Sequence, residues 1–315
     1  MKRSLSFLPW LLALIVLAML PELLPVKYYL HLSILALIWV IVAQGQNLIQ
    51  GFTGYVSIVQ AGFMGIGAYG SALLSLNLQW PLWATVAMAP VITALFALLT
   101  GYPSLRVKGH YFAIVTLAFN LIIVIVLVHY SELTKGEAGI SNIPKPWGGS
   151  REAFYYLALV LASALTLLAA LIARSRVGEI LLAIRQNEDL VAAVGIAAWK
   201  YKLFAFVVSA MYAGLGGALY AHFQGFINPE IFGVAQSLDA ILAVILGGAG
   251  TIAGPAIGAF LVVFLPELLR FADSFRLILY GLILVLATIF MPIGIVGIAR
   301  SGFARMTGRG GQHGG

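Results

Sequence analysis

Five amide side chains interrupt the apolar stretches of this 315-residue sequence and are its first candidates for chemistry. They are Gln44, Gln46, Asn47, Gln60 and Asn120. Neutral amides inside apolar segments can line a path along which a zwitterionic solute passes without being held tightly. They can also form hydrogen bonds between helices, worth about 0.6 kcal/mol each, and this is the commoner role for any single amide.

A second group of polar residues lies in the internal hydrophilic stretch 174–202. Four aliphatic residues recur there at helical spacing: Ile180, Ile184, Val191 and Val194. Charged and amide side chains occupy the other side, and Gly195 follows where a C-cap glycine is expected. The pattern predicts an amphipathic helix, broken near Asn187, that stands clear of the bilayer. Such a helix can lie on the membrane surface or dock into a groove on a cytoplasmic partner. The acidic Glu188 and Asp189 favour docking, because surface helices present Lys and Arg to anionic lipid.

The remaining polar residues form no constellation for catalysis. His110, His129 and His222 are scattered near the boundaries of apolar stretches and lack metal-ligand spacing. The sequence has no cysteine, no nucleophile–base pair within an apolar stretch, and no G-x-x-x-x-G-K-[ST] loop for binding ATP phosphates. The sequence therefore predicts a protein that is not an enzyme, uses no cofactor or metal, and cannot itself hydrolyse ATP.

The composition identifies the lipid bilayer as the solvent of this chain. Apolar residues make up 62% of the sequence and charged residues 9%, with a mean hydropathy of +1.02, whereas a soluble domain has about 25% charged residues. The net charge of +7 could suggest a nucleic-acid partner. The charges, however, form short clusters between apolar runs, as in cytoplasmic loops, so we expect no nucleic acid.

About ten apolar runs predict an all-α, polytopic integral membrane protein, because their lengths suit helices and exceed the roughly ten residues of a barrel strand. The runs are 5–24, 28–49, 54–76, 81–100, 111–130, 154–173, 204–223, 237–246, 253–269 and 275–290. The third and eighth runs can be broken or re-entrant. The first is interpreted as a retained helix rather than a signal peptide, because it is long and no small-x-small cleavage site follows it.

The distribution of Lys and Arg predicts the orientation. With ten crossings and the N-terminus inside, twelve of the eighteen basic residues fall in cytoplasmic loops or tails. This predicts a transmembrane domain over 1–300, with a cytoplasmic loop at 174–202 and a Gly- and Pro-rich periplasmic loop at 131–152. A flexible cytoplasmic tail would follow over 301–315, so that both termini are cytoplasmic. One miscounted helix would move 300–309 outside and break the charge bias.

Two glycine-containing patterns predict close packing. Small residues recur through the third run at spacings of 3, 4, 4, 3 and 4: Gly54, Ser57, Ala61, Gly65, Ala68 and Ala72. Such a continuous helical stripe either packs against a neighbouring helix or faces a counterpart across a pore. The run 247–255 is most simply the tight turn of a helical hairpin, with Pro255 opening the next helix. A non-helical break that lines a cavity is the alternative.

Five segments in order carry a resemblance to a known family. They are GFTGYVS at 51–57 with QAGFMGIGAY at 60–69, GHYFAIVTLAF at 109–119, GEILLAIRQNEDLVAAVGI at 178–196 with YKLFAF at 201–206, GLGGALYA at 214–221, and GGAGTIAGPAIGA at 247–259. Together they resemble the permeases of branched-chain amino-acid ABC importers over about 44–297, and the LivM-type permease subunit most closely. The sequence departs from the family's pattern at Tyr55 and Gln60, which leaves the substrate preference open.

The resemblance implies a function and a set of partners. The chain would be the membrane-spanning permease subunit of an ATP-driven importer that moves branched-chain amino acids across the bacterial inner membrane. Its partners would be a LivH-type permease subunit, two cytoplasmic ATP-binding subunits and a periplasmic substrate-binding protein, which would dock on 131–152 and 225–236. Coupling to the ATPases would rest on six residues of the cytoplasmic stretch: Gly178, Ile184, Arg185, Glu188, Asp189 and Gly195.

Two alternatives to amino-acid import stay open. Related permeases carry urea or short amides, so these solutes are the closest rivals within the same importer class. An ion-coupled secondary transporter usually needs an ionisable residue near mid-membrane, and none is well centred in the apolar runs of this sequence.

Overall fold

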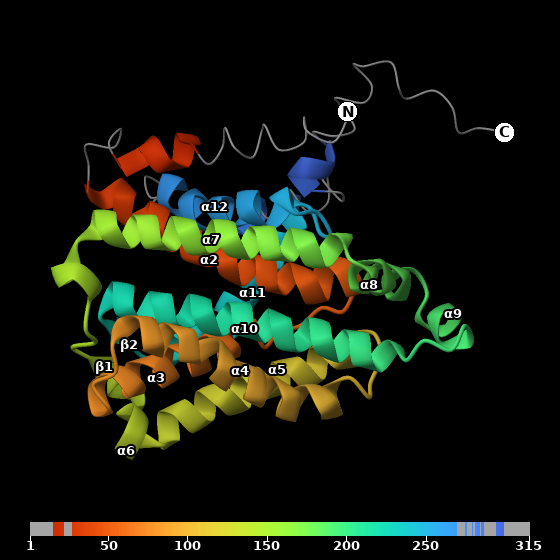
Figure 1. Ribbon diagram of the computed structural model, residues 1–315, viewed down its shortest axis with the longest axis horizontal. Coiled ribbons are helices and arrows are strands. Elements are labelled where there is room, and N and C mark those ends of the chain that lie inside the picture. Colours follow the sequence, from red (N-terminus) through yellow and green to blue (C-terminus); the bar gives the residue numbers. More distant parts are fainter. Residues whose placement is uncertain are drawn as a thin grey trace.

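The computed structural model describes residues 15–21 and 27–269, together with 275, 279, 281–283, 285–286 and 294–298. The described chain is a bundle of helices that run along one common axis (Figure 1). The long helices are α2 (Lys27–Thr53), α3 (Gln60–Asn77), α4 (Leu82–Ser104), α5 (His110–His129), α7 (Arg151–Arg174), α10 (Ala198–Gln224), α11 (Val234–Gly247) and α12 (Ala253–Leu268). The prediction of an all-α fold is confirmed.

The described part of the chain does not confirm the ten membrane crossings predicted from the sequence. Six stretches are long and apolar enough to cross a membrane: α2, α4, α5, α7, α10 and the stretch Pro229–Gly247, which contains α11. Helix α12 is apolar but shorter. The predicted first run, 5–24, and the tenth, 275–290, lie largely outside the described residues, as does the tail 301–315. The count of ten therefore stays a prediction.

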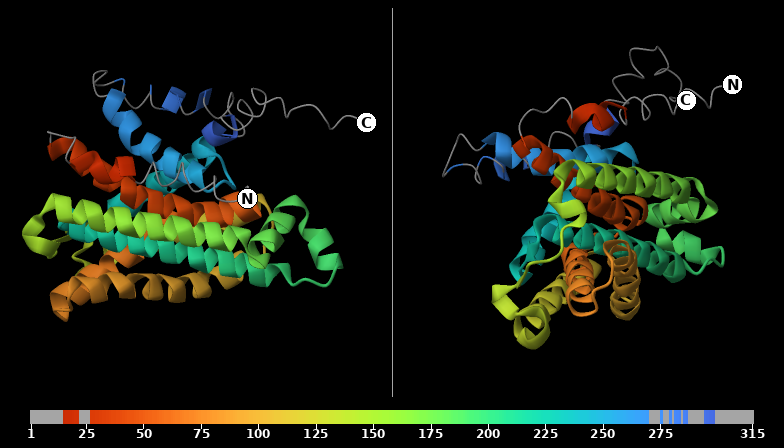
Figure 2. Two further views of the ribbon diagram at one scale, coloured as in Figure 1. Left: turned by 45° about the horizontal axis from the view of Figure 1, so that its top comes forward. Right: turned by 60° about the vertical axis from the view of Figure 1, so that its left-hand side comes forward.

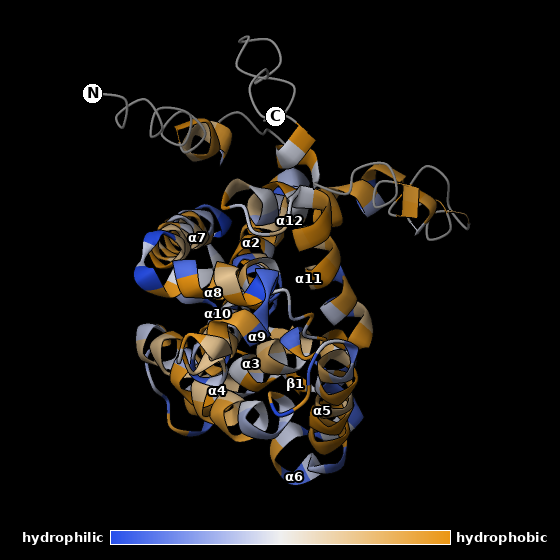
Figure 3. Ribbon diagram, turned by 90° about the vertical axis from the view of Figure 1, so that its right-hand side faces the viewer, coloured by the Kyte–Doolittle hydropathy of each residue, from blue (hydrophilic) through white to orange (hydrophobic). Residues whose placement is uncertain are grey.

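The bundle has a buried centre and an apolar periphery. Helix α2 is the centre: 89% of its most apolar window is buried, against 22% for the corresponding windows of α5 and α7. Seen from one end, α7, α12, α11 and α10 surround α2, while α4 and α5 lie on the outside beyond α3 (Figure 3). Large apolar side chains such as Trp83, Leu99 and Ile114 are exposed on the outer helices. Apolar side chains on this outer surface fit contact with lipid tails.

The predicted external loop and the segment after α10 meet at one end of the bundle. This end contains α6 (Ser131–Thr134), the 3₁₀ helices η2 (Gly136–Ala138), η3 (Pro146–Gly149) and η4 (Pro229–Phe232), and a two-stranded antiparallel sheet. Strand β1 (Ile140–Ser141) pairs with β2 (Phe226–Ile227), with Ile140 opposite Ile227. We call it the β end. The two segments expected to receive one partner therefore lie together (Figures 1 and 2).

The opposite end carries α8 (Arg176–Gln186) and α9 (Glu188–Ala193), which extend beyond the long helices (Figures 1 and 2). We call it the α8–α9 end. The stretches 131–152 and 174–202 thus lie at opposite ends of one bundle, while their assignment to the two sides of a membrane stays a prediction. The chain reaches the α8–α9 end through α7 and leaves it through α10, both of which run the length of the bundle (Figure 1).

The predicted continuous stripe in the third run is wrong at its start. Helix α2 continues to Thr53 and α3 begins only at Gln60, so Gly54 and Ser57 lie in non-helical backbone. Gly54 has φ +77°, which ends α2 where the chain reverses. The rest of the stripe lies in α3 and is buried against neighbouring segments: a Cβ added at Gly65 would lie 3.0 Å from the Phe232 Cβ of η4. The closest approach of α3 to α10 falls outside the stripe, at Gly67, where a Cβ would lie 2.2 Å from the carbonyl oxygen of Gly214.

The turn predicted within 247–255 is confirmed. Helix α11 ends at Gly247, α12 begins at Ala253, and the two pack as a hairpin. Gly248 and Gly250 have φ values of +122° and +80°, a region that favours glycine. The hairpin is tight because a Cβ at Gly258 would lie 1.8 Å from the carbonyl oxygen of Ala243.

Candidate functional site

The α8–α9 end is shaped by its own capping residues. The hydroxyl of Ser175 caps α8 by accepting a hydrogen bond from the Gly178 N–H at 3.4 Å. Asn187 is extended, with φ −160° and ψ 104°, so it ends α8; its Oδ1 then accepts from the N–H groups of Asp189 and Leu190 and caps α9. Gly195 has φ +82° and follows α9. The predicted break near Asn187 and the predicted terminating glycine are both confirmed.

Gly178 sits at the corner between α7 and α8. A Cβ there would lie 2.5 Å from the carbonyl oxygens of Ile172 and Ala173, so only glycine fits this approach of α8 to the last turn of α7. Ile184 and Val191, together with Ala198, form a small apolar cluster separate from the main core. This cluster folds α8 and α9 onto the start of α10.

The prediction that one apolar face continues through both helices is wrong at Val194, which is 74% exposed. Val191 of α9 still packs with Ile184 of α8, but α9 ends at Ala193, so Val194 lies beyond the helix and off that face. Four large apolar side chains are exposed around α8–α9 instead: Leu182, Leu190, Val194 and Trp199. Exposed apolar side chains at this end are compatible with both roles considered for the helix, docking on a partner and lying on the membrane surface.

The two neighbouring acids of α9 have different environments. Glu188 Oε1 accepts a hydrogen bond from Lys202 Nζ at 2.7 Å, and its Oε2 accepts one from the Tyr55 hydroxyl. Side-chain exposure in this ion pair is 2% for Lys202 and 19% for Glu188. Asp189 pairs with Lys108 at 2.7 Å, but their exposures are 85% and 64%. Glu188 therefore faces the bundle, whereas Asp189 faces solvent, although the sequence placed both on the solvent side.

The charge state of Glu188 follows from these neighbours. Burial alone would raise its pKa, but the hydrogen bonds from Lys202 and Tyr55 and the positive charges of Lys202 and Lys108 together lower the pKa below its ordinary value. The pKa of Asp189 is also lowered, by its hydrogen bond and charge interaction with Lys108. Glu188 is thus held ionised at neutral pH inside a partly buried cluster.

Arg185 joins α8 to the end of α2. Its Nη1 donates a hydrogen bond to the carbonyl oxygen of Gly51 at 2.6 Å. The same guanidinium group lies next to Gly250 in the α11–α12 turn, since a Cβ there would be 2.8 Å from Nη1. One side chain therefore contacts α2 and the hairpin turn. Arg185 is exposed, as the sequence predicted, but its guanidinium group reaches back to the end of α2.

The six residues between α2 and α3, 54–59, form a break that runs back into the bundle. Tyr55, Ser57 and Val59 are 8%, 1% and 0% exposed. Side chains of other helices satisfy the backbone: Gln46 Nε2 donates to the carbonyl oxygen of Ser57 at 3.0 Å, and the N–H of Ile58 donates to Thr116 Oγ1 at 3.0 Å. Non-helical backbone at membrane depth requires such cover by protein or a water-filled cavity.

Helix α3 begins inside the bundle and is capped by two other helices. The N–H of Ala61 donates to Ser237 Oγ of α11 at 2.9 Å, and that of Gly62 donates to Asn120 Oδ1 of α5 at 2.7 Å. The Gln60 amide donates to the carbonyl oxygen of Val42, near the middle of α2, at 3.2 Å. The first N–H groups of a helix have no acceptor within the helix, and here side chains of α5 and α11 supply the acceptors.

Two further amides hold the α11–α12 turn against α2. Gln44 Nε2 donates to the carbonyl oxygen of Ile252 at 2.8 Å. Asn47 donates to the carbonyl oxygen of Thr251 at 2.9 Å and accepts from the N–H of Gly250 at 2.8 Å. All five amides singled out in the sequence are thus buried and form hydrogen bonds between segments, one of the two roles considered for them.

Several polar atoms around the break have no hydrogen-bond partner within the described part of the chain. They include Gln44 Oε1, Gln46 Oε1, Ser57 Oγ and Asn120 Nδ2. A buried polar group without a partner costs about 1–3 kcal/mol, so each calls for an explanation. Around the break, several polar groups are therefore covered by protein yet left available; elsewhere in the described bundle the same holds for the Tyr69 hydroxyl, Asn228 Oδ1 and Gln236 Oε1.

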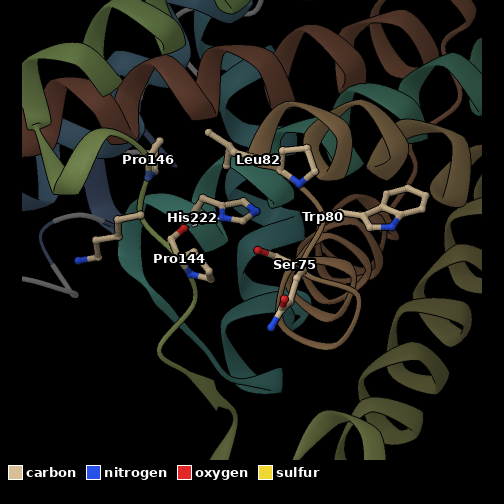
Figure 4. A pocket seen from close by; sticks show the side chains of 9 residues that line it. Ser75, Trp80, Leu82, Pro144, Pro146 and His222 are labelled. Atoms are coloured by element: carbon tan, nitrogen blue, oxygen red, sulfur yellow. Dashed lines mark hydrogen bonds between the residues drawn. The ribbon is translucent and has the colours of Figure 1, made fainter.

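At the β end, a cavity of about 340 Å³ lies where α3, α4, α10 and the 131–152 loop meet. Figure 4 shows His222 from α10 between Pro144 of the loop and Ser75 of α3. His222 Nδ1 lies 2.8 Å from the carbonyl oxygen of Pro144, and Nε2 lies 3.0 Å from Ser71 Oγ. This buried imidazole holds the loop onto the bundle beside the cavity.

Comparison with known proteins identifies the family. A model of the family described as branched-chain amino acid transport system / permease component matches residues 28–288. The chain belongs to this family. This permease is 32% identical to the high-affinity branched-chain amino acid transport system permease protein LivM of Salmonella typhimurium and to that of Escherichia coli K12, over 92% of this chain and 75% of each relative. It is 26% identical to LivH of Salmonella typhimurium, over 82% of this chain and 91% of the relative. No solved structure matches it.

The permease contains site residues that the sequence did not reveal. Lys202 was counted among loop charges, yet it is 1% exposed and joins Glu188 to Tyr55. Ser237 caps α3 although no pattern singled it out. In the sequence, the departure of Tyr55 from the family's motif was the one feature that could have pointed to this cluster. Tyr55 occupies the position where the break meets α9.

Proposed function

We propose that this permease is one membrane-spanning subunit of an ATP-driven importer for branched-chain amino acids in the bacterial inner membrane. Membership of the permease family and the names of the LivM and LivH relatives support this assignment. The observation that carries it is the α8–α9 end, an exposed two-part helix joined to the bundle by Arg185 and Glu188. Such a helix can transmit a movement imposed by a partner to the membrane helices.

The partner at this end is an ATP-binding subunit. The exposed apolar residues Leu190, Val194 and Trp199 offer the surface for a groove. Gly178 and Gly195 set the bends before and after α8–α9, and Ile184 packs the pair onto α10. These residues, with Arg185 and the inward-facing Glu188, make up the coupling element of the importer, whereas Asp189, which the resemblance also implies for coupling, faces solvent outside it.

The complete importer would contain a LivH-type permease, two ATP-binding subunits and a substrate-binding protein. Similarity of this chain to both LivM and LivH relatives supports a pair of related permease subunits. The binding protein would contact the β end, where 131–152 and 225–236 meet beside the cavity.

Charge supports placing the α8–α9 end in the cytoplasm. Around the α4–α5 connection and α8–α9, the described chain carries seven basic and three acidic residues: Arg106, Lys108, Arg174, Arg176, Arg185, Lys200 and Lys202 against Glu179, Glu188 and Asp189. The described loops of the β end carry four of each: Lys27, Lys135, Lys145 and Arg151 against Glu132, Glu137, Glu152 and Glu230. Positive loops stay inside, so the proposed orientation also puts both termini in the cytoplasm.

The proposed translocation path follows the break 54–59 and the amides Gln44, Gln46, Asn47, Gln60 and Asn120. Asn120 Nδ2 is an available donor beside the start of α3, where the helix dipole favours a carboxylate. Gln46 Oε1 and Ser57 Oγ are available acceptors for an ammonium group. A zwitterion passing the break would meet both, while the neutral amides would not hold it tightly.

Reconstitution tests this function. The permease, its LivH-type partner, the two ATP-binding subunits and the binding protein would be incorporated into liposomes containing ATP. Labelled leucine, isoleucine and valine should enter in an ATP-dependent manner that a protonophore does not stop. Uptake of urea but not of leucine would assign the amide alternative, and loss of uptake on adding a protonophore while ATP persists would assign an ion-coupled carrier.

A further inference from the structure

We propose that Glu188, Tyr55 and Lys202 form the link through which movement of α8–α9 reaches the break 54–59 and the start of α3. This inference rests on the proposed function, because it needs an ATPase that moves α8–α9. It goes further by naming the part of the membrane domain that moves and the contacts that move it. It also gives Glu188 a role inside the permease rather than on the ATPase surface.

The three residues come from three separate elements. Glu188 is the first residue of α9, directly after the break at Asn187. Lys202 lies in the first turns of α10, and Tyr55 lies in the break between α2 and α3. Glu188 contacts both partners through its two carboxylate oxygens, and Lys202 Nζ also donates to the Tyr55 hydroxyl at 3.1 Å. Movement of α9 therefore cannot occur without breaking these contacts or moving Tyr55.

Aromatic packing extends the link from Tyr55 to α3. The Tyr55 ring lies under Lys202 Nζ, 4.4 Å from ring centroid to nitrogen, and packs edge-on against Phe112 of α5 at 5.2 Å. Phe112 packs against Phe206 of α10 at 6.0 Å, and Phe206 packs against Phe63 in the first turn of α3 at 5.4 Å. The three phenylalanines are 0–1% exposed. Close-packed rings transmit displacement because no free volume absorbs it.

The break is suited to be the moving part. Its backbone lacks a helical hydrogen-bond ladder, and single side-chain hydrogen bonds to Ser57, Ile58 and the start of α3 hold it in place. Such contacts can be exchanged one at a time, whereas a helix must be unwound cooperatively. Gly54, with φ +77°, sits where the break leaves α2 and meets the Arg185 side chain.

The neighbouring acid provides the matched control. Asp189 is one residue away, carries the same charge and also pairs with a lysine at 2.7 Å, but this pair is exposed. Among the described residues, the Asp189 carboxylate has a hydrogen bond from Lys108 and none from the break. If these acids served to attract or dock the ATPase, replacing Asp189 would impair the importer at least as strongly as replacing Glu188. If Glu188 transmits movement to the break, replacing Glu188 would impair the importer and replacing Asp189 would not.

The test measures ATP hydrolysis and leucine uptake in the same proteoliposomes of the complete importer. Glu188→Gln and Tyr55→Phe should still assemble with the ATPases and hydrolyse ATP, while leucine transported per ATP falls about tenfold. Asp189→Asn should keep the wild-type ratio. An unchanged ratio in Glu188→Gln, or loss of ATPase assembly in that variant, would overturn the inference. Absence of uptake by the wild-type importer would instead overturn the proposed function.

A second measurement does not depend on uptake. The chain contains no cysteine, so Val56→Cys provides a single labelling position in the break, where Val56 is 37% exposed. In the assembled importer, the rate of maleimide labelling at this cysteine should change between the ATP-free and ATP-bound states. Adding Glu188→Gln should abolish that change, and adding Asp189→Asn should preserve it. A labelling rate that ignores ATP in the wild-type background would contradict movement of the break.

Discussion

Lys202 and Glu188 form an ion pair at 2.7 Å in which the lysine is almost fully buried, with 2% of its side chain exposed. A lysine ammonium group in such a place is costly unless it is paired and hydrogen-bonded. Glu188 and Tyr55 supply both requirements. The pair therefore fixes the position of α9 relative to α10 and the break.

Replacing Lys202 should destabilise the permease more than replacing its exposed counterpart. Lys202→Met leaves the Glu188 carboxylate partly buried without a counter-charge, at a cost of about 3 kcal/mol, the low end of the range for buried pairs because Glu188 is partly exposed. Lys108→Met should leave the denaturation midpoint nearly unchanged, since its pair with Asp189 is in solvent. Denaturation midpoints of the purified variants in detergent would compare them, and equal losses would contradict the burial argument.

The effect of pH should follow the lowered pKa of Glu188. A carboxylate whose pKa is lower in the folded state stabilises the fold above its ordinary pKa of about 4.3 and loses this contribution as pH falls through the lowered value. Wild type should therefore exceed Glu188→Gln in thermal stability by a constant margin between about pH 5 and 8. The margin should shrink below about pH 4. A margin that changes near pH 7 would mean that another group controls the cluster.

Removing the cap at the α8–α9 break should loosen α9. Asn187→Ala removes the acceptor for the N–H groups of Asp189 and Leu190 and should cost about 1 kcal/mol. Hydrogen exchange at these two amides should accelerate about fivefold, the rate factor that corresponds to this energy. Gln186→Ala, one residue earlier in the last turn of α8, removes no cap and serves as the control. Equal exchange in the two variants would refute the capping role.

Two glycines on α3 should respond differently to a methyl group. Gly67→Ala places a Cβ 2.2 Å from the backbone carbonyl of Gly214, which cannot move without shifting α10, so we expect a loss of about 1–3 kcal/mol. Gly70→Ala meets only the end of the Ile92 side chain at 3.0 Å, which can rotate away. Thermal unfolding in detergent would separate the two variants. A larger loss for Gly70→Ala would show that α3 and α10 do not pack as described.

Asn120 allows capping and transport to be separated. Asn120→Asp keeps an oxygen that accepts from the N–H of Gly62 but replaces the available Nδ2 donor with a negatively charged oxygen. If a substrate carboxylate passes this position, leucine uptake by the reconstituted importer should fall about tenfold, which corresponds to loss of one charge-assisted hydrogen bond. Ser237→Ala removes a cap from α3 without adding charge, so it controls for the effect of a weakened start of α3 on uptake. Equal uptake in the wild type and Asn120→Asp would remove Asn120 from the path.

The sequence by itself determined the features that depend on neighbours in the chain. The apolar runs specified membrane helices, and Asn187 and Gly195 marked the break and the end of α8–α9, because capping and left-handed backbone are local properties. The glycines of 247–255 specified the hairpin turn for the same reason. The motifs in their order were sufficient to indicate the family.

Only the tertiary structure decided which polar residues act together. Tyr55 and Glu188 are 133 residues apart, and the N–H of Ala61 and its acceptor Ser237 are 176 apart. Nothing in the local pattern separates Glu188 from Asp189, since both are acids in the first turn of one short helix. Consecutive residues of a helix point about 100° apart, so the packing of α9 turns Glu188 inward and leaves Asp189 in water. That difference arises when α9 packs against α10 and the break, because burial and pairing depend on the elements a residue meets in space.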